Sequence, residues 1–279
     1  MIDLTGLSLA VFAAFFFGTY YVPLKRINGI DSYTYQFFVG IGAIIVGVSA
    51  SFLLGIPLQI NVIGLIPGII WAAANLISVN AIRYMGVSGV AIAQAVIVLV
   101  SFLWGVIFFQ ESFESITLAI AGISLLILGL PLISSRDKGS SIRKGFALFV
   151  IAGIIWGSVY VAPLMYKMSA GSIIPSMMFG IFVSGILSFS AGKRHTSASG
   201  ALNSVFSGIL WAIGNVSAAL SIDYIGLALA GPIPQLAMLV SVSWGVLYFK
   251  EVREKGKVAR VVIGGIVLVI GAILLALAK

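Results

Sequence analysis

The sequence predicts an all-α integral membrane protein with ten transmembrane helices, arranged as two inverted five-helix repeats. Composition is the first reason, because 61% of the 279 residues are hydrophobic and only 9% are charged, whereas soluble domains carry about 25% charged residues. The apolar residues also come in continuous blocks of about 20, the length that crosses a bilayer core as a helix. The third reason is an internal repeat, described below. Continuously apolar blocks favour helices over the short, alternating strands of a barrel.

The predicted helices are separated by short loops that leave no room for a folded soluble domain. In chain order they cover roughly 4–24, 34–54, 60–82, 87–109, 115–134, 144–166, 172–191, 200–222, 226–249 and 258–278. Many of the 32 glycines fall at small-residue spacings that let transmembrane helices approach closely. The first five residues contain an Asp and no Lys or Arg, so a cleaved signal peptide is not expected.

The basic residues indicate how the helices are oriented. With the loops placed alternately on two sides, all but two of the 16 Lys and Arg residues fall on one side, and only Lys167 and Lys279 fall on the other. Basic loops stay in the cytoplasm, so both termini are expected outside the cell membrane. The net charge of +8 is explained by this bias, and no nucleic-acid partner is predicted.

The internal repeat appears when the sequence is shifted by 140 residues. Residues 68–111 and 208–251 are then identical at 16 of 44 ungapped positions, including Trp, Asn and Tyr positions that apolar composition alone would not align. The first helices align at a shift of 139, which pairs Tyr21 with Tyr160. We therefore divide the chain into repeats 1–139 and 140–279, which together form one integrated membrane domain.

The odd number of helices in each repeat has a topological consequence. A second copy that follows five helices starts on the opposite side of the membrane, so the two copies are inverted. Inverted repeats build alternating-access transporters, with the substrate bound near the midplane between the repeats. The sequence therefore favours a carrier of a small polar solute.

Several motifs make the chain resemble a known superfamily. The endings of the fourth helix in each repeat read SFLWGVIFFQE (101–111) and SVSWGVLYFKE (241–251), and they resemble those of ten-helix drug/metabolite transporters. The stretch FFGTYYVPLKRI (16–27), followed by Gln36, Phe37 and Phe38, is similar to the glucose/ribose porter branch, which includes bacterial glucose-uptake proteins and the transmembrane protein 144 group. The resemblance implies carbohydrate uptake, with proton coupling as an open alternative.

Two matched pairs of residues are the first substrate-binding candidates. Trp71 and Asn75 in the third helix, and Trp211 and Asn215 in the eighth, are four residues apart and therefore share a helix face. An aromatic ring can cover the CH groups of a sugar, and an amide both donates to and accepts from hydroxyls. The alternative is that the buried amides bridge helices.

Two glutamines and a Pro-rich run are the next candidates. Gln94 and Gln235 lie early in the fourth and ninth helices, and Gln235 closes the run Gly231-Pro232-Ile233-Pro234-Gln235. Proline removes a helical hydrogen bond, so we expect this helix to break and free backbone carbonyls. The fourth helix has no such Pro pair, which predicts an asymmetric site. A kink needed only for shape is the alternative.

Aromatic and basic residues at the ends of the first helix of each repeat are weighed against membrane anchoring. Tyr and Trp at helix ends are commonly interface anchors, but the repeat favours Tyr21 and Tyr160 as substrate-binding candidates over Tyr20 and Trp156. Lys25 is a gating candidate, with a snorkelling cation as the structural alternative.

The remaining gating or coupling candidates are charged residues at helix ends. Arg83 and Asp223 are equivalent under the repeat, as are Glu111 and Glu251. A solvated or structural helix end is the alternative for each. No Asp or Glu lies in the middle of a predicted helix, although proton-coupled carriers commonly use an intramembrane carboxylate. The sequence therefore predicts either coupling through these end residues or a facilitator.

The function predicted from these observations is sugar transport, most simply of glucose, by alternating access. Export of amino acids or other small metabolites is the alternative. An enzyme is not predicted, because the spans lack the Ser/His, Cys or paired-carboxylate sets that hydrolysis needs. No cofactor and no metal site are expected, and the expected partners are the sugar, the bilayer and the open case of protons. The chain is expected to act as a monomer or homodimer.

Overall fold

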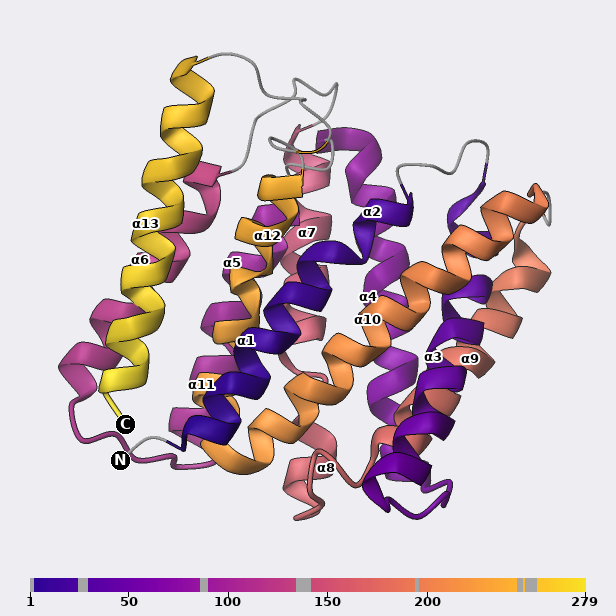
Figure 1. Ribbon diagram of the computed structural model, residues 1–279, viewed down its shortest axis with the longest axis horizontal. Coiled ribbons are helices and arrows are strands. Elements are labelled where there is room, and N and C mark those ends of the chain that lie inside the picture. The colour runs from indigo at the N-terminus through magenta and orange to yellow at the C-terminus, as the bar shows by residue number, and fades with distance from the viewer. Residues whose placement is uncertain are drawn as a thin grey trace.

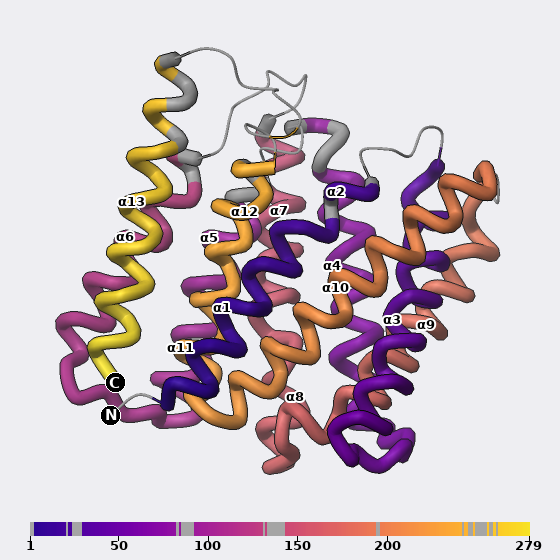
Figure 2. The backbone as a smooth tube through the Cα atoms, in the orientation of Figure 1, coloured from indigo at the N-terminus to yellow at the C-terminus, as the bar shows by residue number. Residues whose placement is uncertain are grey.

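All regular structure in the described part of the chain is helical. The computed structural model describes residues 3–24, 30–85, 90–133, 142–193, 196–244, 248 and 255–279. The helices run side by side or cross at shallow angles, and the two termini lie at the same end of the bundle (Figures 1 and 2). This arrangement agrees with the all-α class that the sequence predicts.

The helices of the first half of the chain are α1 to α6. They are α1 (Leu4–Thr19), α2 (Tyr21–Leu24), α3 (Ser32–Leu54), α4 (Val62–Met85), α5 (Val90–Leu103), the π-helical turn η2 (Trp104–Phe108) and α6 (Ile116–Ile133). The predicted span 4–24 is thus divided between α1 and α2, at the point where Thr19 ends the first helix.

The second half contains α7 to α13. They are α7 (Ile142–Gly157), α8 (Val161–Met165), α9 (Ile174–Ala191), α10 (Ala198–Ile225), α11 (Leu227–Ala230), the 3-10 helix η3 (Ile233–Leu236), α12 (Ala237–Ser243) and α13 (Lys255–Leu277).

Five of these segments are long and apolar enough to cross a membrane. They are Ser32–Leu54, Val62–Ala81, Arg143–Met165, Ile174–Ala191 and Ala198–Ile225. Five further apolar helical segments are shorter: Leu4–Thr19, Ile92–Phe108, Ile116–Leu130, Leu227–Ser241 and Val262–Leu277. The outward faces of the helices carry large apolar side chains, such as Phe52 and Leu53 of α3, as expected of a protein surrounded by lipid.

Polar side chains cap several helices at the ends of the bundle. Asp31 accepts hydrogen bonds from the backbone N–H groups of Tyr33 and Thr34 at the start of α3, and from that of Lys193 just after α9. Burial opposes the ionisation of Asp31, but these bonds and one from the Thr34 hydroxyl outweigh it and lower its pKa below the ordinary value. Asp31 therefore joins the start of α3 to the end of α9.

Helices of the first half of the chain pack against helices of the second half. α3 packs on α9 and α6 on α13, while α1 packs on α10 as α4 packs on α7. Close approach depends on glycine: a Cβ on Gly68 in α4 would meet the backbone oxygen of Met177 in α9, and one on Gly208 in α10 would meet that of Val39 in α3. These contacts surround a core in which Trp71 and Trp211 are both buried.

The predicted break at residues 231–235 is confirmed. α11 ends at Ala230, a single 3-10 turn covers Ile233–Leu236, and α12 continues from Ala237. The corresponding segment of the first half is continuous, because α5 runs from Val90 to Leu103 without a Pro. The two halves therefore differ where the sequence predicts an asymmetry.

Candidate substrate cavity

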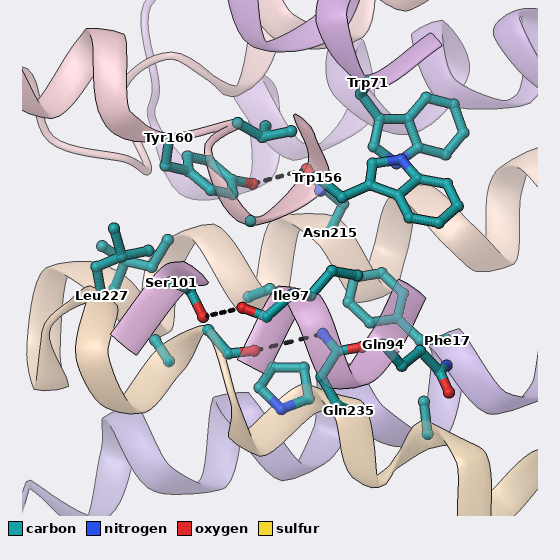
Figure 3. Close-up of a pocket in the computed structure, with 18 of the residues that line it drawn as sticks. Phe17, Trp71, Gln94, Ile97, Ser101, Trp156, Tyr160, Asn215, Leu227 and Gln235 are labelled. Atoms are coloured by element: carbon teal, nitrogen blue, oxygen red, sulfur yellow. Dashed lines mark hydrogen bonds between the residues drawn. The ribbon is translucent and has the colours of Figure 1, made fainter. Parts of the chain in front are cut away.

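A cavity of about 140 Å³ lies between the two halves of the chain (Figure 3). It is surrounded by α1, α4, α5, α7 and α10 and by the broken segment 227–237. None of its described lining residues is charged. They are Phe17, Tyr20, Trp71, Gln94, Ile97, Ser101, Trp156, Gly157, Val159, Tyr160, Trp211, Asn215, Ala218, Ile222, Leu227, Ala230, Gly231, Pro234, Gln235 and Ala237.

Aromatic rings form one wall of this cavity. The rings of Trp71 and Trp211 lie 3.9 Å apart between centroids at an interplanar angle of 36°. Phe17 of α1 stacks on Trp211 at 6.4 Å and 24°. The two tryptophans come from helices that the repeat makes equivalent, and the fold brings them together at the centre. Such a wall can cover the CH groups of a small solute.

Polar side chains lie beside this wall. The Tyr160 hydroxyl donates to Oδ1 of Asn215 at 3.1 Å (Figure 3). The Nε2 group of Gln235 donates to the backbone oxygen of Gly231 at 3.3 Å, a carbonyl that belongs to the break between α11 and η3. The broken helix and the α10 amide therefore both contribute polar groups to the cavity.

Two polar atoms at the cavity are buried without a hydrogen-bond partner among the described residues. They are Oε1 of Gln94 in α5 and Nε1 of Trp156 in α7. A buried polar atom left unpaired costs roughly 1–3 kcal/mol, and such atoms are rare in folded proteins. The cavity is therefore lined by one unpaired hydrogen-bond donor and one unpaired acceptor among the described residues.

Asn75 and its repeat equivalent Asn215 have different surroundings in the structure. Asn75 is absent from the lining residues, and its Nδ2 group donates to Oε1 of Gln36 in α3 at 2.6 Å. Both residues are buried, and Gln36 is completely so. Asn75 therefore bridges α4 and α3, which is the helix-bridging alternative weighed in the sequence analysis.

The sequence did not predict four of the aromatic or hydroxyl-bearing lining residues: Phe17, Tyr20, Ser101 and Trp156. The side chain of Tyr21, which the sequence favours over Tyr20 as a substrate-binding candidate, lies outside the described residues. Phe17 and Trp156 are equivalent at the shift of 139 residues. That equivalence was the available signal, but aromatic residues near helix ends resemble membrane anchors.

The described charged candidates accept hydrogen bonds from backbone N–H groups at a helix start and at a turn. Glu111 accepts from the backbone N–H groups of Leu227 at 2.7 Å and Ala228 at 3.2 Å, and its Oε2 lies 3.4 Å from Nζ of Lys279. Asp223 accepts from the Ser169 hydroxyl and from two backbone N–H groups, those of Ala170 and Gly171, at 2.7–2.8 Å. Lys25, Glu251 and the side chain of Arg83 lie outside the described residues.

These bonds give Asp223 a structural role that can be tested. We expect Asp223→Ala to lower the thermal midpoint of unfolding, because two backbone donors of the turn after α8 lose their acceptor. Affinity for the sugar that the sequence predicts as substrate should stay unchanged, since Asp223 does not line the cavity. Thermal unfolding and sugar binding measured on one preparation check both expectations, and a weakened affinity at unchanged stability would contradict them.

A matched pair of hydrogen bonds joins the two halves. Nε1 of Trp104 donates to Oγ of Ser158 at 2.9 Å, and Nε1 of Trp244 donates to Oγ1 of Thr19 at 3.2 Å. Each hydroxyl also donates to the carbonyl four residues earlier in its own helix. The two tryptophans are equivalent at a shift of 140 and the hydroxyl residues at a shift of 139. We call these bonds the cross-half pairs.

Residues 8–278 match a family model described as "Sugar transport protein". The glucose uptake protein GlcU of Bacillus subtilis (strain 168) is 26% identical, over 98% of this chain and 98% of the relative. A protein named for sugar uptake in Streptococcus pyogenes serotype M1 is 30% identical, over 80% of each chain. A crystal structure at 13% identity covers 100% of both chains with a TM-score of 0.82, a likeness of fold.

Proposed function

This chain belongs to the sugar transport protein family, and from that premise we propose that it carries glucose or a similar monosaccharide across the plasma membrane by alternating access. It is a multi-pass membrane transporter of sugars. The observation that carries the proposal is the uncharged cavity between the halves, where the Trp71 and Trp211 rings lie beside the Asn215 amide. Rings and amides together suit the CH and hydroxyl groups of a sugar.

We further propose that all ten apolar helical segments span the bilayer, as two inverted repeats covering 1–139 and 140–279. Helix packing supports this proposal. Under the repeat α1 corresponds to α7 and α4 to α10, so the packing of α1 on α10 corresponds to that of α7 on α4. The contact of α3 with α10 likewise corresponds to that of α9 with α4. A two-fold relation between the halves accounts for both correspondences.

The proposed orientation places the basic ends of the helices in the cytoplasm and both termini outside. The described cations Arg143, Lys144 and Lys193 lie where α7 begins and α9 ends. Only Lys167 and Lys279 lie at the other end among the described residues. This distribution follows the rule that basic residues remain on the cytoplasmic side.

The cross-half pairs are the proposed gates, one toward each side of the membrane. The pair at Thr19 has an additional bond, because Oγ of Ser241 donates to the backbone oxygen of Gly18 at 2.9 Å. The equivalent Ser101 instead donates within its own helix, to Ile97, and lines the cavity. The halves are therefore joined more completely at the Gly18 end, where the cytoplasmic gate is proposed to be closed in this conformation.

The lining chemistry favours a facilitator over export of amino acids or proton symport. An amino acid zwitterion would need charged partners, and a proton relay needs a titratable group within the membrane. None of the described lining residues carries a charge. Glu111 and Asp223 are engaged with backbone N–H groups at helix ends, so we propose structural roles for both.

Uptake of labelled glucose by purified protein in liposomes tests this function, with and without an inward proton gradient. We expect equilibration that saturates with glucose concentration and is unchanged by the gradient. Accumulation driven by the gradient would overturn the facilitator mechanism and return attention to Glu111 and Asp223. Absence of flux for glucose and for a panel of other monosaccharides would overturn sugar uptake itself.

A further inference from the structure

We infer that Trp156 and Gln94 form a hydroxyl-recognition pair that makes this cavity selective for neutral monosaccharides. In the pair, Trp156 donates its indole N–H to one sugar hydroxyl oxygen and Gln94 accepts a hydroxyl proton through Oε1. The inference rests on the proposed function and deepens it, because it names the specificity-determining atoms and the class of sugar that they admit.

Both atoms of the pair are unpaired among the described residues. Nε1 of Trp156 and Oε1 of Gln94 are buried and have no hydrogen-bond partner among the described residues, yet both residues line the cavity. An indole N–H can only donate, and an amide oxygen can only accept. A hydroxyl group can satisfy either atom, whereas an apolar ligand would leave both unpaired.

Gln94 and Trp156 lie on two tightly packed helices, α5 and α7. A Cβ on Gly153 of α7 would lie 2.7 Å from the backbone oxygen of Ala93, and one on Gly157 would lie 3.3 Å from that of Ile97. Gln94 and Trp156 are neighbours of these contact positions on α5 and α7. Side chains on closely packed, rigid elements are well placed to discriminate by geometry.

Three other polar groups of the cavity already take part in hydrogen bonds within the protein. Oδ1 of Asn215 accepts from Tyr160, Nε2 of Gln235 donates to Gly231, and the Ser101 hydroxyl donates to Ile97. A sugar that bonds these groups has internal bonds to replace. Bonds to Trp156 and Gln94 replace none, so they contribute more of the net binding free energy.

Absence of charge sets the class of sugar. No Asp, Glu, Lys or Arg is among the described lining residues, so a phosphorylated sugar or a uronate would bury a charge without a counter-ion, which is costly. A neutral monosaccharide needs only the donor and acceptor that the pair supplies. A site built to bond a hydroxyl also rejects the analogue lacking that hydroxyl, because its own polar group is then left unpaired.

Trp156→Phe and Gln94→Leu test the inference, since the first keeps an aromatic ring without the N–H and the second removes the amide. Gln59→Leu is the control, because Gln59 is exposed and lies outside the cavity. Binding of glucose, single-deoxy glucoses, glucose 6-phosphate and glucuronate is measured on the purified proteins, together with the thermal midpoint of each protein without ligand.

Trp156→Phe and Gln94→Leu should each bind glucose at least about tenfold more weakly than the wild-type protein does, as expected for loss of a buried hydrogen bond. Thermal midpoints without ligand should stay equal or rise, because Nε1 of Trp156 and Oε1 of Gln94 have no hydrogen-bond partner to lose among the described residues. At least one single-deoxy glucose should bind the wild-type protein as weakly as glucose binds one of the variants. That variant should bind glucose and this deoxy glucose equally well, because the bond that distinguishes them is already lost. The two anionic sugars should not bind.

Different failures have different meanings. If wild type binds glucose and both variants bind it equally well, or if the variants lose affinity only in proportion to lost stability, the recognition pair is wrong while sugar uptake stands. Binding of glucose 6-phosphate or glucuronate as tightly as glucose would overturn the restriction to neutral sugars. If wild type neither binds nor transports any monosaccharide tested, the proposed function itself is overturned.

Discussion

Replacing Asn215 with Ala is expected to lower sugar uptake about tenfold or more while leaving the protein folded. Asn215 lines the cavity, and its side chain accepts a hydrogen bond from the Tyr160 hydroxyl, which is itself a lining residue (Figure 3). After the substitution that hydroxyl can bond to water in the cavity, so little stability is lost. Uptake in liposomes, normalised to the amount of folded protein, measures the effect.

Asn75→Ala is the matched comparison, because the repeat makes the two asparagines equivalent. Here Oε1 of Gln36 loses its donor in a fully buried position, where Nε2 of Gln36 is already unpaired among the described residues. The expected cost is roughly 1–3 kcal/mol of stability, seen as a lower thermal midpoint, with affinity for sugar retained. Equal losses of affinity in both variants would show that the two asparagines serve one symmetric site.

Gly18→Ala is expected to reduce uptake about tenfold or more by holding the proposed cytoplasmic gate apart. A Cβ on Gly18 would collide with the side chain of Val240 and the backbone oxygen of Ala237. The hydrogen bond from the Ser241 hydroxyl to the Gly18 carbonyl lies at the same contact between α1 and α12. Because the gate must close for alternating access, a population shifted away from this conformation transports slowly. Uptake in liposomes is the first measurement.

Accessibility of position 241 gives a second measurement for the gate. The chain has no cysteine, so Ser241→Cys introduces a single thiol. An impermeant thiol reagent added to the cytoplasmic side should label it faster when Gly18→Ala is also present. Gly256→Ala is the control, since a Cβ there meets no atom within 4 Å. Normal uptake together with unchanged labelling in Gly18→Ala would contradict the gate.

Repeat equivalence allows a comparison at the other gate. A Cβ on Gly157 would meet Val100 side-chain atoms at 2.8–2.9 Å, which is a looser contact than the one at Gly18. We therefore expect Gly157→Ala to reduce uptake less than Gly18→Ala does. The difference has a physical cause in the conformation described, because the two ends of the cavity are not equally closed.

Sequence reasoning reached those site residues whose positions follow from local pattern or from the repeat. Trp71 and Trp211 were paired by the repeat, and the structure brings their rings together. The break at 231–235 followed from its two prolines, since proline cannot continue the helical bonding. Trp156 was not predicted as a lining residue, because an aromatic side chain at a helix end has the same sequence pattern whether it anchors a membrane surface or lines a cavity.

The sequence by itself determined that this protein is a bundle of apolar helices, that its chain contains a repeat, and which residue types could meet a sugar. The length of the apolar blocks and the charge bias can be read directly from the sequence, and a bilayer allows few structures other than helices for such blocks. Only the tertiary structure decided which of the two equivalent asparagines lines the cavity. Asn75 is hydrogen-bonded to Gln36 of α3, whereas Asn215 is a lining residue. The tertiary structure also left Nε1 of Trp156 and Oε1 of Gln94 without a partner among the described residues, since a partner depends on which helices pack together and not on the neighbours in the chain.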